Sequence, residues 1–544
     1  KLQSSAVLTA LNACAVATFA VLALTHARAL GYVLAALTLA GIVGQVRSQF
    51  ARTITAQLLV AAGILVDYQR APGIGAAGIA LGGFILATLI IDQPILAEVV
   101  DRPMVRVANL PGYVPEKRHL VTPRLLYAGN LALIAVAGVF ALAGVTEWLF
   151  VALAAALAGV TAWVGLEALQ LRLRGSLTEK RLHTAIVAHD PAFALHFSAP
   201  DHTEYHVEMW RPYLERIGRP WVIILREPHS FDRIAAASSV PVIYTPLVQH
   251  IDDVITPNMK AVFYVNNGGK NTHMVRLNQL THIQLLHGDS DKASSFNPVT
   301  AMFDKIFVAG QAGIDRYEAN GVLIPRPKFD IVGRPQVESV QVASNHIGEV
   351  TDKHVLYATT WVGLYADVNF CSLPIGERIV AKLIERKVTV ILRPHPYADR
   401  DPASVRHLTR LHQMLADDRT RTGRQHVFGP AATEQMTLFD CINRADAMIS
   451  DVSGVASDFL YSGKPFALTN MLGESPETFA ASFPLSKAAY VLDKPAANID
   501  AVLDDLLEKD PLELARRETR VYYLGDFPEA GYADAFVAAA RKYV

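Results

Sequence analysis

The chain has 544 residues, of which 51% are hydrophobic and only 19% are charged, and its formal net charge is -1. A nearly neutral chain has no excess of positive charge to attract nucleic acid, so the composition excludes a partner of that kind. The three cysteines, Cys14, Cys371 and Cys441, lie too far apart in the sequence to form a metal or redox motif. Apolar residues are concentrated in residues 5–168, whereas residues 180–544 have the composition of an ordinary globular protein. The sequence therefore predicts a membrane segment followed by a soluble one.

Six apolar runs approach the roughly 20 residues that span a bilayer, although the third is short enough to be re-entrant or interfacial. They cover residues 5–25, 29–46, 53–67, 72–91, 126–145 and 147–168. With six spans and both ends in the cytoplasm, the outside loops hold only Arg28 and Arg70, and the inside segments hold the other flanking basic residues. This asymmetry predicts a cytoplasmic soluble part. A five-span arrangement stays open for the first residues.

The loop from Asp92 to Arg124 mixes basic and apolar side chains, among them Arg102, Arg106, Lys117, Arg118 and His119. Such a segment either lies at the membrane interface and attracts anionic lipid head groups, or is a solvated linker with ordinary flanking basic residues.

From residue 183 onward, short apolar strands alternate with helical stretches such as Gly376–Arg386 and Ala403–Ala416. This alternation predicts parallel, doubly wound sheets, and two such series imply two Rossmann-like halves. We therefore expect a membrane domain at 1–175 and halves at 180–340 and 350–544. The expected strands are Thr184–Ala188, Trp221–Leu225, Pro241–Tyr244, Ala261–Val265, His282–Leu286, Lys305–Val308, Asp330–Val332, Val355–Ala358, Val388–Leu392, His426–Phe428, Ala447–Ser450, Pro465–Leu468 and Ala489–Leu492.

Polar side chains recur just after these strands, where parallel sheets bind their ligands. One of these sites, Ser450–Gly454, ends a buried strand in a tight turn before a helix, an arrangement that favours an anion. The others are His287-Gly288, Gly333-Arg-Pro335, Thr359-Thr-Trp361 and Arg393-Pro-His-Pro396.

Taken in order, these motifs resemble those of the CDP-glycerol glycerophosphotransferases, the teichoic-acid primases and polymerases of bacterial walls. The resemblance covers roughly residues 260–544 and includes Ile449-Ser-Asp-Val-Ser-Gly-Val-Ala-Ser-Asp-Phe459. It implies a GT-B fold, CDP-glycerol as donor, and transfer of glycerol phosphate to a hydroxyl of a lipid-linked or wall glycan acceptor with loss of CMP. It also implies a bacterial plasma membrane as the location. The chain departs from the family pattern at Asp289-Ser290, Gln336 and Val452.

The reaction needs a base near the acceptor hydroxyl and positive potential around the diphosphate. We expect His287 to be the base, and His395 to donate a hydrogen bond to the donor phosphates or to act as a general acid. Ser453 and the Gly454 amide are expected at the diphosphate, which the fork of Arg393 would also grip.

Several other residues are candidates. Asp451 either caps the following helix, holds a ribose or glycerol hydroxyl, or orients a neighbour, whereas Asp458 reads as an ordinary charged helix residue. Thr359, Thr360 and Arg334 are expected to line the donor pocket. A polar loop after a strand either meets the acceptor or is a surface turn, and it holds Asn266, Asn267, Lys270 and Asn271.

The sequence offers no Asp-x-Asp pair after a strand and no His/Cys cluster with metal-ligand spacing. We therefore expect no obligatory metal, although Mg²⁺ can bind through the substrate phosphates. Two alternatives remain open: a transferase that uses CDP-ribitol or a nucleotide sugar, and a polyprenyl-lipid carrier or exporter with a nucleotide-sensing module. The acceptor and the oligomeric state are not predicted.

Overall fold

The computed structural model of the protein describes residues 2–45, 50–100, 104–114, 123–363 and 369–544. The chain forms two compact units. The helical unit comprises Lys1–Met104 and Tyr113–Thr184, and the α/β unit comprises Val105–Gly112 and Ala185–Val544. The boundary therefore lies at residue 184, later than the expected 175, and it falls within a single long helix.

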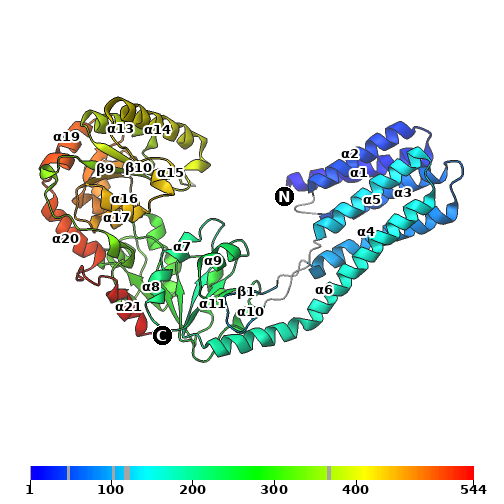
Figure 1. Cartoon of the computed structure of the whole chain (residues 1–544), viewed down its shortest axis with the longest axis horizontal. Helices are drawn as coiled ribbons and strands as arrows, with labels where there is room; N and C mark the ends of the chain where they lie inside the picture. The colour runs from blue at the N-terminus through cyan, green and yellow to red at the C-terminus, as the bar shows by residue number, and fades with distance from the viewer. Residues whose placement is uncertain (1, 46–49, 101–103, 115–122, 364–368) are drawn as a thin grey trace. The chain divides into compact units, whose positions relative to one another are not determined.

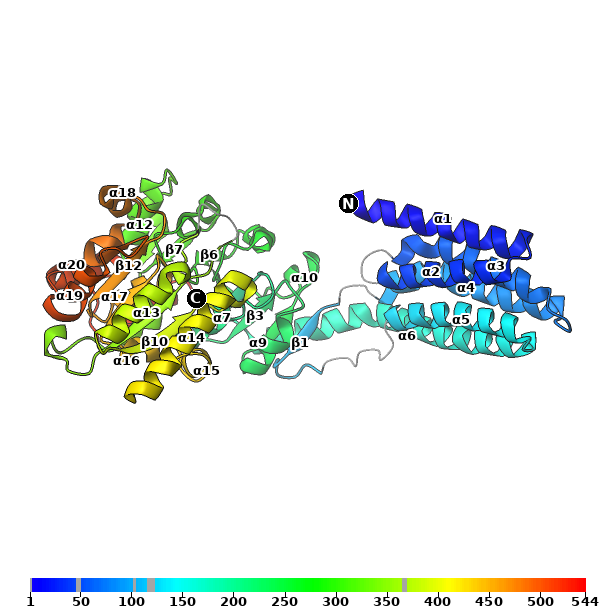
Figure 2. The same ribbon diagram turned by 90° about the horizontal axis from the view of Figure 1, so that it is seen from above.

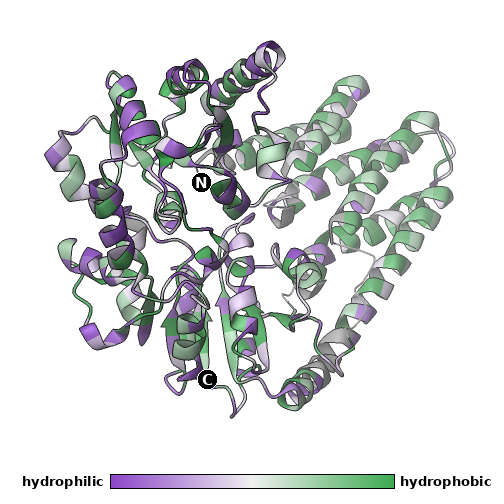
Figure 3. Ribbon diagram, turned by 60° about the vertical axis from the view of Figure 1, so that its left-hand side comes forward, coloured by the Kyte–Doolittle hydropathy of each residue, from purple (hydrophilic) through white to green (hydrophobic). Residues whose placement is uncertain are grey.

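The helical unit has one helix at each of the six predicted apolar runs, and Figure 3 shows that apolar residues dominate them. Four helices are long and apolar enough to cross a membrane, over Ala6–Leu24, Ala76–Gln93, Leu125–Ala143 and Glu147–Gln170, whereas the second and third are shorter. The helices are α1 (Leu2–Leu24), α2 (Arg28–Gln45), α3 (Ile54–Gln69), α4 (Ala76–Val100), α5 (Pro123–Ala143) and α6 (Glu147–His189).

The loop between α4 and α5 forms an edge strand, β1 (Arg106–Ala108), which neither expectation for this loop included. β1 pairs antiparallel with β4 of the α/β unit. Arg106 is ion-paired with Asp232 and lies 4.1 Å from the ring centroid of Phe231. These contacts hold Arg106 within the α/β unit, and the lipid-facing interpretation of the loop stays a prediction. Arg102, Lys117, Arg118 and His119 lie outside the described residues.

The first half of the α/β unit is built on an eight-stranded sheet of order β1-β4-β3-β2-β5-β6-β7-β8, parallel except for β1. β2 lies near the middle and is buried at every position. The sequence did not predict β2, because the strand was expected at the apolar run Thr184–Ala188. That run instead forms the last turns of α6. The other strands are β3 (Trp221–Leu225), β4 (Val242–Tyr244), β5 (Ala261–Tyr264), β6 (Thr281–Gln284), β7 (Lys305–Val308) and β8 (Phe329–Ile331), with β2 at Phe193–Phe197.

The second half is built on a five-stranded, wholly parallel sheet of order β10-β9-β11-β12-β13. The prediction of two parallel sheets is therefore confirmed. The expected strand His426–Phe428 is wrong, because only Val427 forms an isolated bridge, to Ile391. The strands are β9 (His354–Thr359), β10 (Thr389–Pro394), β11 (Ala447–Ser450), β12 (Phe466–Asn470) and β13 (Tyr490–Asp493).

Helices flank both sheets, and the last one returns to the first half (Figures 1 and 2). Phe536 of this helix packs against Trp210 and Phe307, so the second half does not run unbroken to residue 544. The helices are α7 (Tyr205–Glu208), α8 (Arg211–Glu215), α9 (Phe231–Ala237), α10 (Gln249–Asp252), α11 (Thr272–Val275), α12 (Gln311–Ala319), α13 (Gly376–Glu385), α14 (Pro402–Thr422), α15 (Pro430–Thr433), α16 (Leu438–Arg444), α17 (Gly454–Leu460), α18 (Pro476–Ser482), α19 (Ile499–Asp504), α20 (Glu513–Leu524) and α21 (Asp534–Arg541).

Candidate active site

The strand order of the second sheet reverses between β9 and β11, which lie side by side. In doubly wound sheets, such a reversal opens a crevice at the carboxyl ends of the two strands. The residues that follow these strands are Thr360 after β9 and Asp451 after β11. The Oδ2 atom of Asp451 accepts a hydrogen bond of 2.7 Å from the Thr360 backbone N–H. The two predicted motifs therefore meet at the point where a ligand is expected.

Asp451 is fully buried and holds neighbouring loops in place. Its Oδ2 atom also accepts from the Ser372 backbone N–H at 3.2 Å, and its Oδ1 atom accepts from the Thr469 hydroxyl at 2.8 Å. The N-cap of α17 is Ser453, and no side chain caps this helix. Of the interpretations for Asp451, the one that orients neighbours agrees with these contacts and the capping one is wrong.

The serine turn faces the loop that follows β6 in the first half. A Cβ atom added to Gly454 would lie 3.5 Å from the backbone oxygen of Asp289, which is an ordinary van der Waals contact, so the two loops lie close together. The Ser453 hydroxyl contacts only the Ser450 hydroxyl, at 3.4 Å, among the described residues. The Ser453–Gly454 turn and the His287-Gly288 loop, predicted to share a site, are thus neighbours across the two halves.

His287 is aimed by a strained turn. Leu286, directly before it, has a φ of 57°, a value rarely adopted by a branched side chain outside functional turns. The Trp210 indole N–H donates to the Leu286 carbonyl at 2.6 Å, which fixes the turn. The His287 Nδ1 atom lies 3.1 Å from the Val265 carbonyl. Since a carbonyl only accepts, Nδ1 carries the proton and Nε2 keeps its lone pair.

Burial lowers the pKa of His287 to about 4, so its imidazole is neutral at pH 7. A neutral imidazole with a free Nε2 lone pair is the form that a general base requires.

His395 has the opposite tautomer. It follows β10, and its backbone N–H donates to the Thr359 carbonyl at 2.9 Å. Its Nδ1 atom accepts from the Tyr397 backbone N–H at 3.0 Å, so Nε2 carries the proton. Burial lowers the pKa of His395 to about 4. A neutral imidazole is a good hydrogen-bond donor and a poor general acid, so of the two expected roles the structure favours the donor.

Lys292 belongs to none of the motifs found in the sequence. Its side chain extends from the loop that carries His287 to the second half. Its ammonium group donates to the Thr360 hydroxyl at 3.2 Å and lies 5.2 Å from the ring centroid of Phe370. Burial lowers the pKa of Lys292 and the charge of Asp451 opposes this lowering, although among the described residues no carboxylate forms an ion pair with Lys292. A partly buried cation without a carboxylate partner is an anion-binding candidate. The available signal was its place five residues after His287, in a loop that follows a buried strand.

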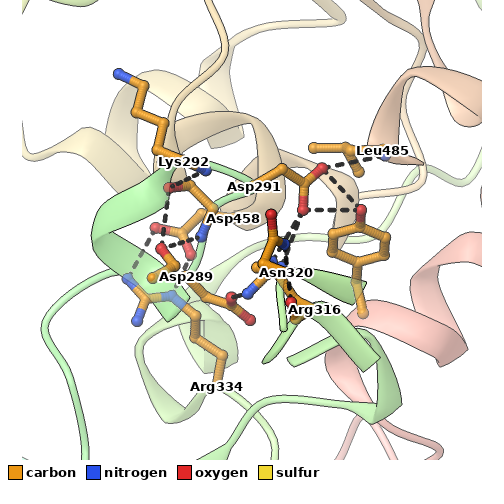
Figure 4. Close-up of polar contacts among 11 residues, drawn as sticks. Asp289, Asp291, Lys292, Arg316, Asn320, Arg334, Asp458 and Leu485 are labelled. Atoms are coloured by element: carbon orange, nitrogen blue, oxygen red, sulfur yellow. Dashed lines mark hydrogen bonds and ion pairs between the residues drawn. The ribbon is translucent and has the colours of Figure 1, made fainter. Parts of the chain in front are cut away.

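The base of this loop is fixed by a network of ion pairs, shown in Figure 4, from which the Lys292 side chain points away. Arg316 is ion-paired with Asp289 and, at 3.0 Å, with Asp291. Asp291 also accepts from the Tyr523 hydroxyl at 2.9 Å and from the Leu485 backbone N–H at 3.3 Å, both in the second half. The network therefore ties the loop that carries His287 and Lys292 to the opposite half.

The Arg334 side chain also links the two halves of the α/β unit. Its guanidinium forms a two-point ion pair with Asp458 of α17, and both side chains are buried. Gly333 supplies the turn with a φ of 73°, and a Cβ there would lie 3.0 Å from the Tyr532 hydroxyl oxygen. Arg334 is thus adjacent to the site but its guanidinium is paired, and Asp458 is not the ordinary surface residue that the sequence suggested.

Arg393 is turned to the backbone of the second half. Its guanidinium donates to the carbonyls of Ala432 and Met436, the latter at 2.9 Å. These contacts bind the end of α15 and its following turn to β10. The Arg393 guanidinium, which was expected to bind the phosphates, therefore has a structural role in this structure. The cation next to the Thr360 hydroxyl is Lys292.

The predicted acceptor loop follows β5, and its side chains bond within the first half. Asn271 is fully buried between His196 and the Asn266 carbonyl, which contradicts direct contact with an acceptor. Lys270 is ion-paired with Glu227 at 2.9 Å, and Asn267 donates to the Thr300 hydroxyl at 3.2 Å. The loop is therefore an internally bonded turn in this structure.

Thr359 and Thr360 are both buried at the crevice. The Thr359 hydroxyl has no hydrogen-bond partner among the described residues, whereas that of Thr360 meets Lys292. One trio among the described side chains has metal-ligand spacing, His346, Asp510 and Glu513. Because Asp510 is already ion-paired with buried Arg516, this trio is a poor candidate for a metal centre, and the independence from metal stays a prediction.

Three solved structures illustrate what the chain resembles in fold. The wall teichoic acid polymerase TagF is 12% identical, with a TM-score of 0.42, over 68% of this chain and 95% of that one. A glycosyltransferase from Rickettsia africae is 11% identical, with a TM-score of 0.40, over 65% and 97%. Anabaena HepE, solved with UDP and glucose, is 11% identical, with a TM-score of 0.38, over 64% and 99%. No residue correspondence follows from likenesses of this size.

No curated protein matches the chain significantly in sequence. A family model does match, over residues 315–470, and it describes the CDP-glycerol:poly(glycerophosphate) glycerophosphotransferases. The matched segment includes Thr360, His395, Asp451 and Ser453, but it begins after His287. Residues 315–470 therefore carry the sequence pattern of the CDP-glycerol:poly(glycerophosphate) glycerophosphotransferase family.

Proposed function

We propose that the protein transfers glycerol phosphate from CDP-glycerol to a hydroxyl group of a lipid-linked or cell-wall glycan acceptor and releases CMP. The observation that carries this proposal is the family match over the segment that forms the β9/β11 crevice. The apolar helices support a place in the bacterial plasma membrane, and the basic residues that flank them support a cytoplasmic α/β unit.

In the proposed reaction the acceptor oxygen attacks the phosphorus that carries glycerol. The new phosphorus–oxygen bond forms as the bond to the oxygen shared with CMP breaks, and CMP leaves with that electron pair. His287 Nε2 takes the proton of the acceptor hydroxyl and later passes it to water. A phosphate monoester has its second pKa near 6, so CMP leaves without needing a proton at pH 7. This agrees with a hydrogen-bond donor, rather than an acid, at His395.

The donor diphosphate is placed between the two halves. Lys292 supplies the positive charge, and the Thr360 hydroxyl lies within hydrogen-bond distance of its ammonium group. The Ser453 hydroxyl is a further donor, from the turn after β11. The Nε2–H of His395 donates from the loop after β10. Charge that develops on the leaving group is then met by fixed donors in a partly buried crevice, where such interactions are strongest.

The test is CMP release by the purified full chain in detergent, with CDP-glycerol and a panel of polyprenyl-diphosphate-linked glycans. We expect CMP release that depends on an acceptor and falls by at least about 100-fold in His287→Ala. Parallel reactions with CDP-ribitol and with UDP-sugars decide the donor. Release from a UDP-sugar alone, or no release with any donor and acceptor, would overturn the proposal.

A further inference from the structure

His206 is a second histidine at the site, outside every motif of the sequence. It lies in the short helix α7, and its imidazole stacks face to face on that of His287, with ring centroids 3.7 Å apart and planes 10° apart. The Tyr205 ring meets His206 edge-on at 4.3 Å. His206 is only 6% exposed. Helix α7 therefore lays a flat, buried ring over one face of the candidate base.

The polar atoms of His206 do not explain its presence. Its Nδ1 atom is buried and has no hydrogen-bond partner among the described residues. A buried polar atom without a partner destabilises the folded chain, so an apolar ring would be more favourable for packing alone. We therefore explain the presence of His206 by its effect on the adjacent His287 ring.

The groups around His287 come from three directions. Tyr205 and His206 of α7 cover one side, the Val265 carbonyl after β5 holds Nδ1, and Arg334 adds positive potential from the turn after β8. Asp458 neutralises part of that potential through its ion pair with Arg334. Burial is the largest of the influences that lower the pKa of His287, and the next charge effect also opposes protonation.

We propose that His206 is a positioning residue for His287: its stacked ring excludes water from one face of the imidazole and holds it in the orientation that meets the Val265 carbonyl. The stack cannot hold two protonated rings, because two imidazolium ions at this distance would repel each other. Burial lowers the pKa of His206 far below its ordinary value, and His287 adds to this lowering. The pair therefore stays uncharged, and His287 stays a base, over the physiological range.

This inference rests on the proposed function, but its test uses no substrate. Diethyl pyrocarbonate acylates only the neutral form of imidazole, and peptide mass spectrometry reports the acylation rate at His287 in the full chain in detergent. N-acetylhistidine in the same tube, with its rate divided by its own neutral fraction at each pH, corrects for loss of reagent. The variants are His206→Ala, which removes the ring, His206→Phe, which keeps a ring, and His202→Ala, which removes a largely exposed histidine of the same segment.

For the native chain and for the Phe variant, we expect similar corrected rates at about pH 5.5 and pH 8, because His287 stays neutral at both. In His206→Ala, water reaches the imidazole and its pKa rises toward the ordinary 6.5, so the rate at pH 5.5 falls about tenfold below that at pH 8. His202→Ala should behave as native. The proposal is overturned if His206→Ala titrates like the native chain, or if either control variant shifts as much as the alanine variant.

Discussion

Lys292 and Thr360 come from opposite halves of the α/β unit, and the Lys292 ammonium donates a hydrogen bond of 3.2 Å to the Thr360 hydroxyl. Thr360 is in turn held by the buried carboxylate of Asp451. Lys292 is held at its base by the ion pairs of Asp289 and Asp291. Both residues are therefore held in place by other side chains. The Lys292 ammonium group lies between the two halves, where the proposed diphosphate would bind.

Replacing Lys292 by Met keeps the stem and removes the charge. We expect kcat/KM for CDP-glycerol to fall about 10- to 100-fold, since a hydrogen bond to a charged group contributes about 1.5–3 kcal/mol. The loss should appear in KM for the donor and in competition by CMP, measured by steady-state kinetics. Lys270→Met is the matched control, because its ammonium is already paired with Glu227. Equal losses in the two variants would remove Lys292 from the donor site.

The pH dependence of turnover follows from the lowered pKa of His287. Because the neutral imidazole is the active form, activity is lost as the pH falls through the folded-state value of about 4, and not through the ordinary 6.5. We therefore expect kcat/KM to be nearly constant between about pH 5.5 and 7.5. A rate profile with initial-velocity measurements in overlapping buffers tests this. An acid limb centred near 6.5 would show that His287 is solvated during turnover.

Much of the fold was predictable because apolar patterning specifies buried parallel strands. Trp221–Leu225, Lys305–Val308 and Ala447–Ser450 were predicted with their observed limits. β2 was not, because the apolar pattern favours a strand at Thr184–Ala188 just before it, although that run belongs to the end of α6. β1 was also out of reach, since its pairing with β4 joins residues more than 130 apart in the sequence. Local pattern carries no information about such a partner.

For the site, sequence position identified the loops but not the direction of their side chains. Arg393 lies at the end of β10 and Lys292 in the loop after β6, yet Arg393 turns to backbone carbonyls and Lys292 turns to Thr360. The burial of Asn271 depends on His196, a residue of the strand that was missed. The stack of His206 on His287 joins residues 81 apart and has no local signature. Each of these differences comes from a tertiary contact, which no motif encodes.

The buried ion pair of Arg334 and Asp458 joins the two halves, so removing one partner leaves an uncompensated charge in the interior. We expect Asp458→Asn to destabilise the α/β unit by about 3–5 kcal/mol, and Arg334→Met with Asp458→Leu together to recover most of that loss. The midpoint of thermal unfolding of the full chain reports both. Asp534→Asn, which removes an exposed partner of Arg216, serves as the control and should change stability by less than about 1 kcal/mol. A double variant as unstable as the single one would contradict this account.

Asp451→Asn tests whether the buried carboxylate sets the geometry of the crevice. The Oδ2 atom accepts from two backbone N–H groups and Oδ1 accepts from the Thr469 hydroxyl, so an amide group cannot satisfy all three donors. We expect a loss of about 1–3 kcal/mol in stability together with a several-fold rise in KM for CDP-glycerol, because Thr360 loses its support.

The matched control for Asp451→Asn is Asp401→Ala, since the Asp401 side chain caps α14 by accepting from the Ser404 backbone N–H. Loss of this cap should lower the free energy of unfolding by a comparable amount, about 1 kcal/mol, and so lower the unfolding midpoint. KM for the donor should stay unchanged. Thermal unfolding and donor kinetics on the same preparations separate the two effects. If Asp401→Ala raises KM as much as Asp451→Asn does, the kinetic change reflects lost stability alone, and Asp451 does not shape the donor crevice.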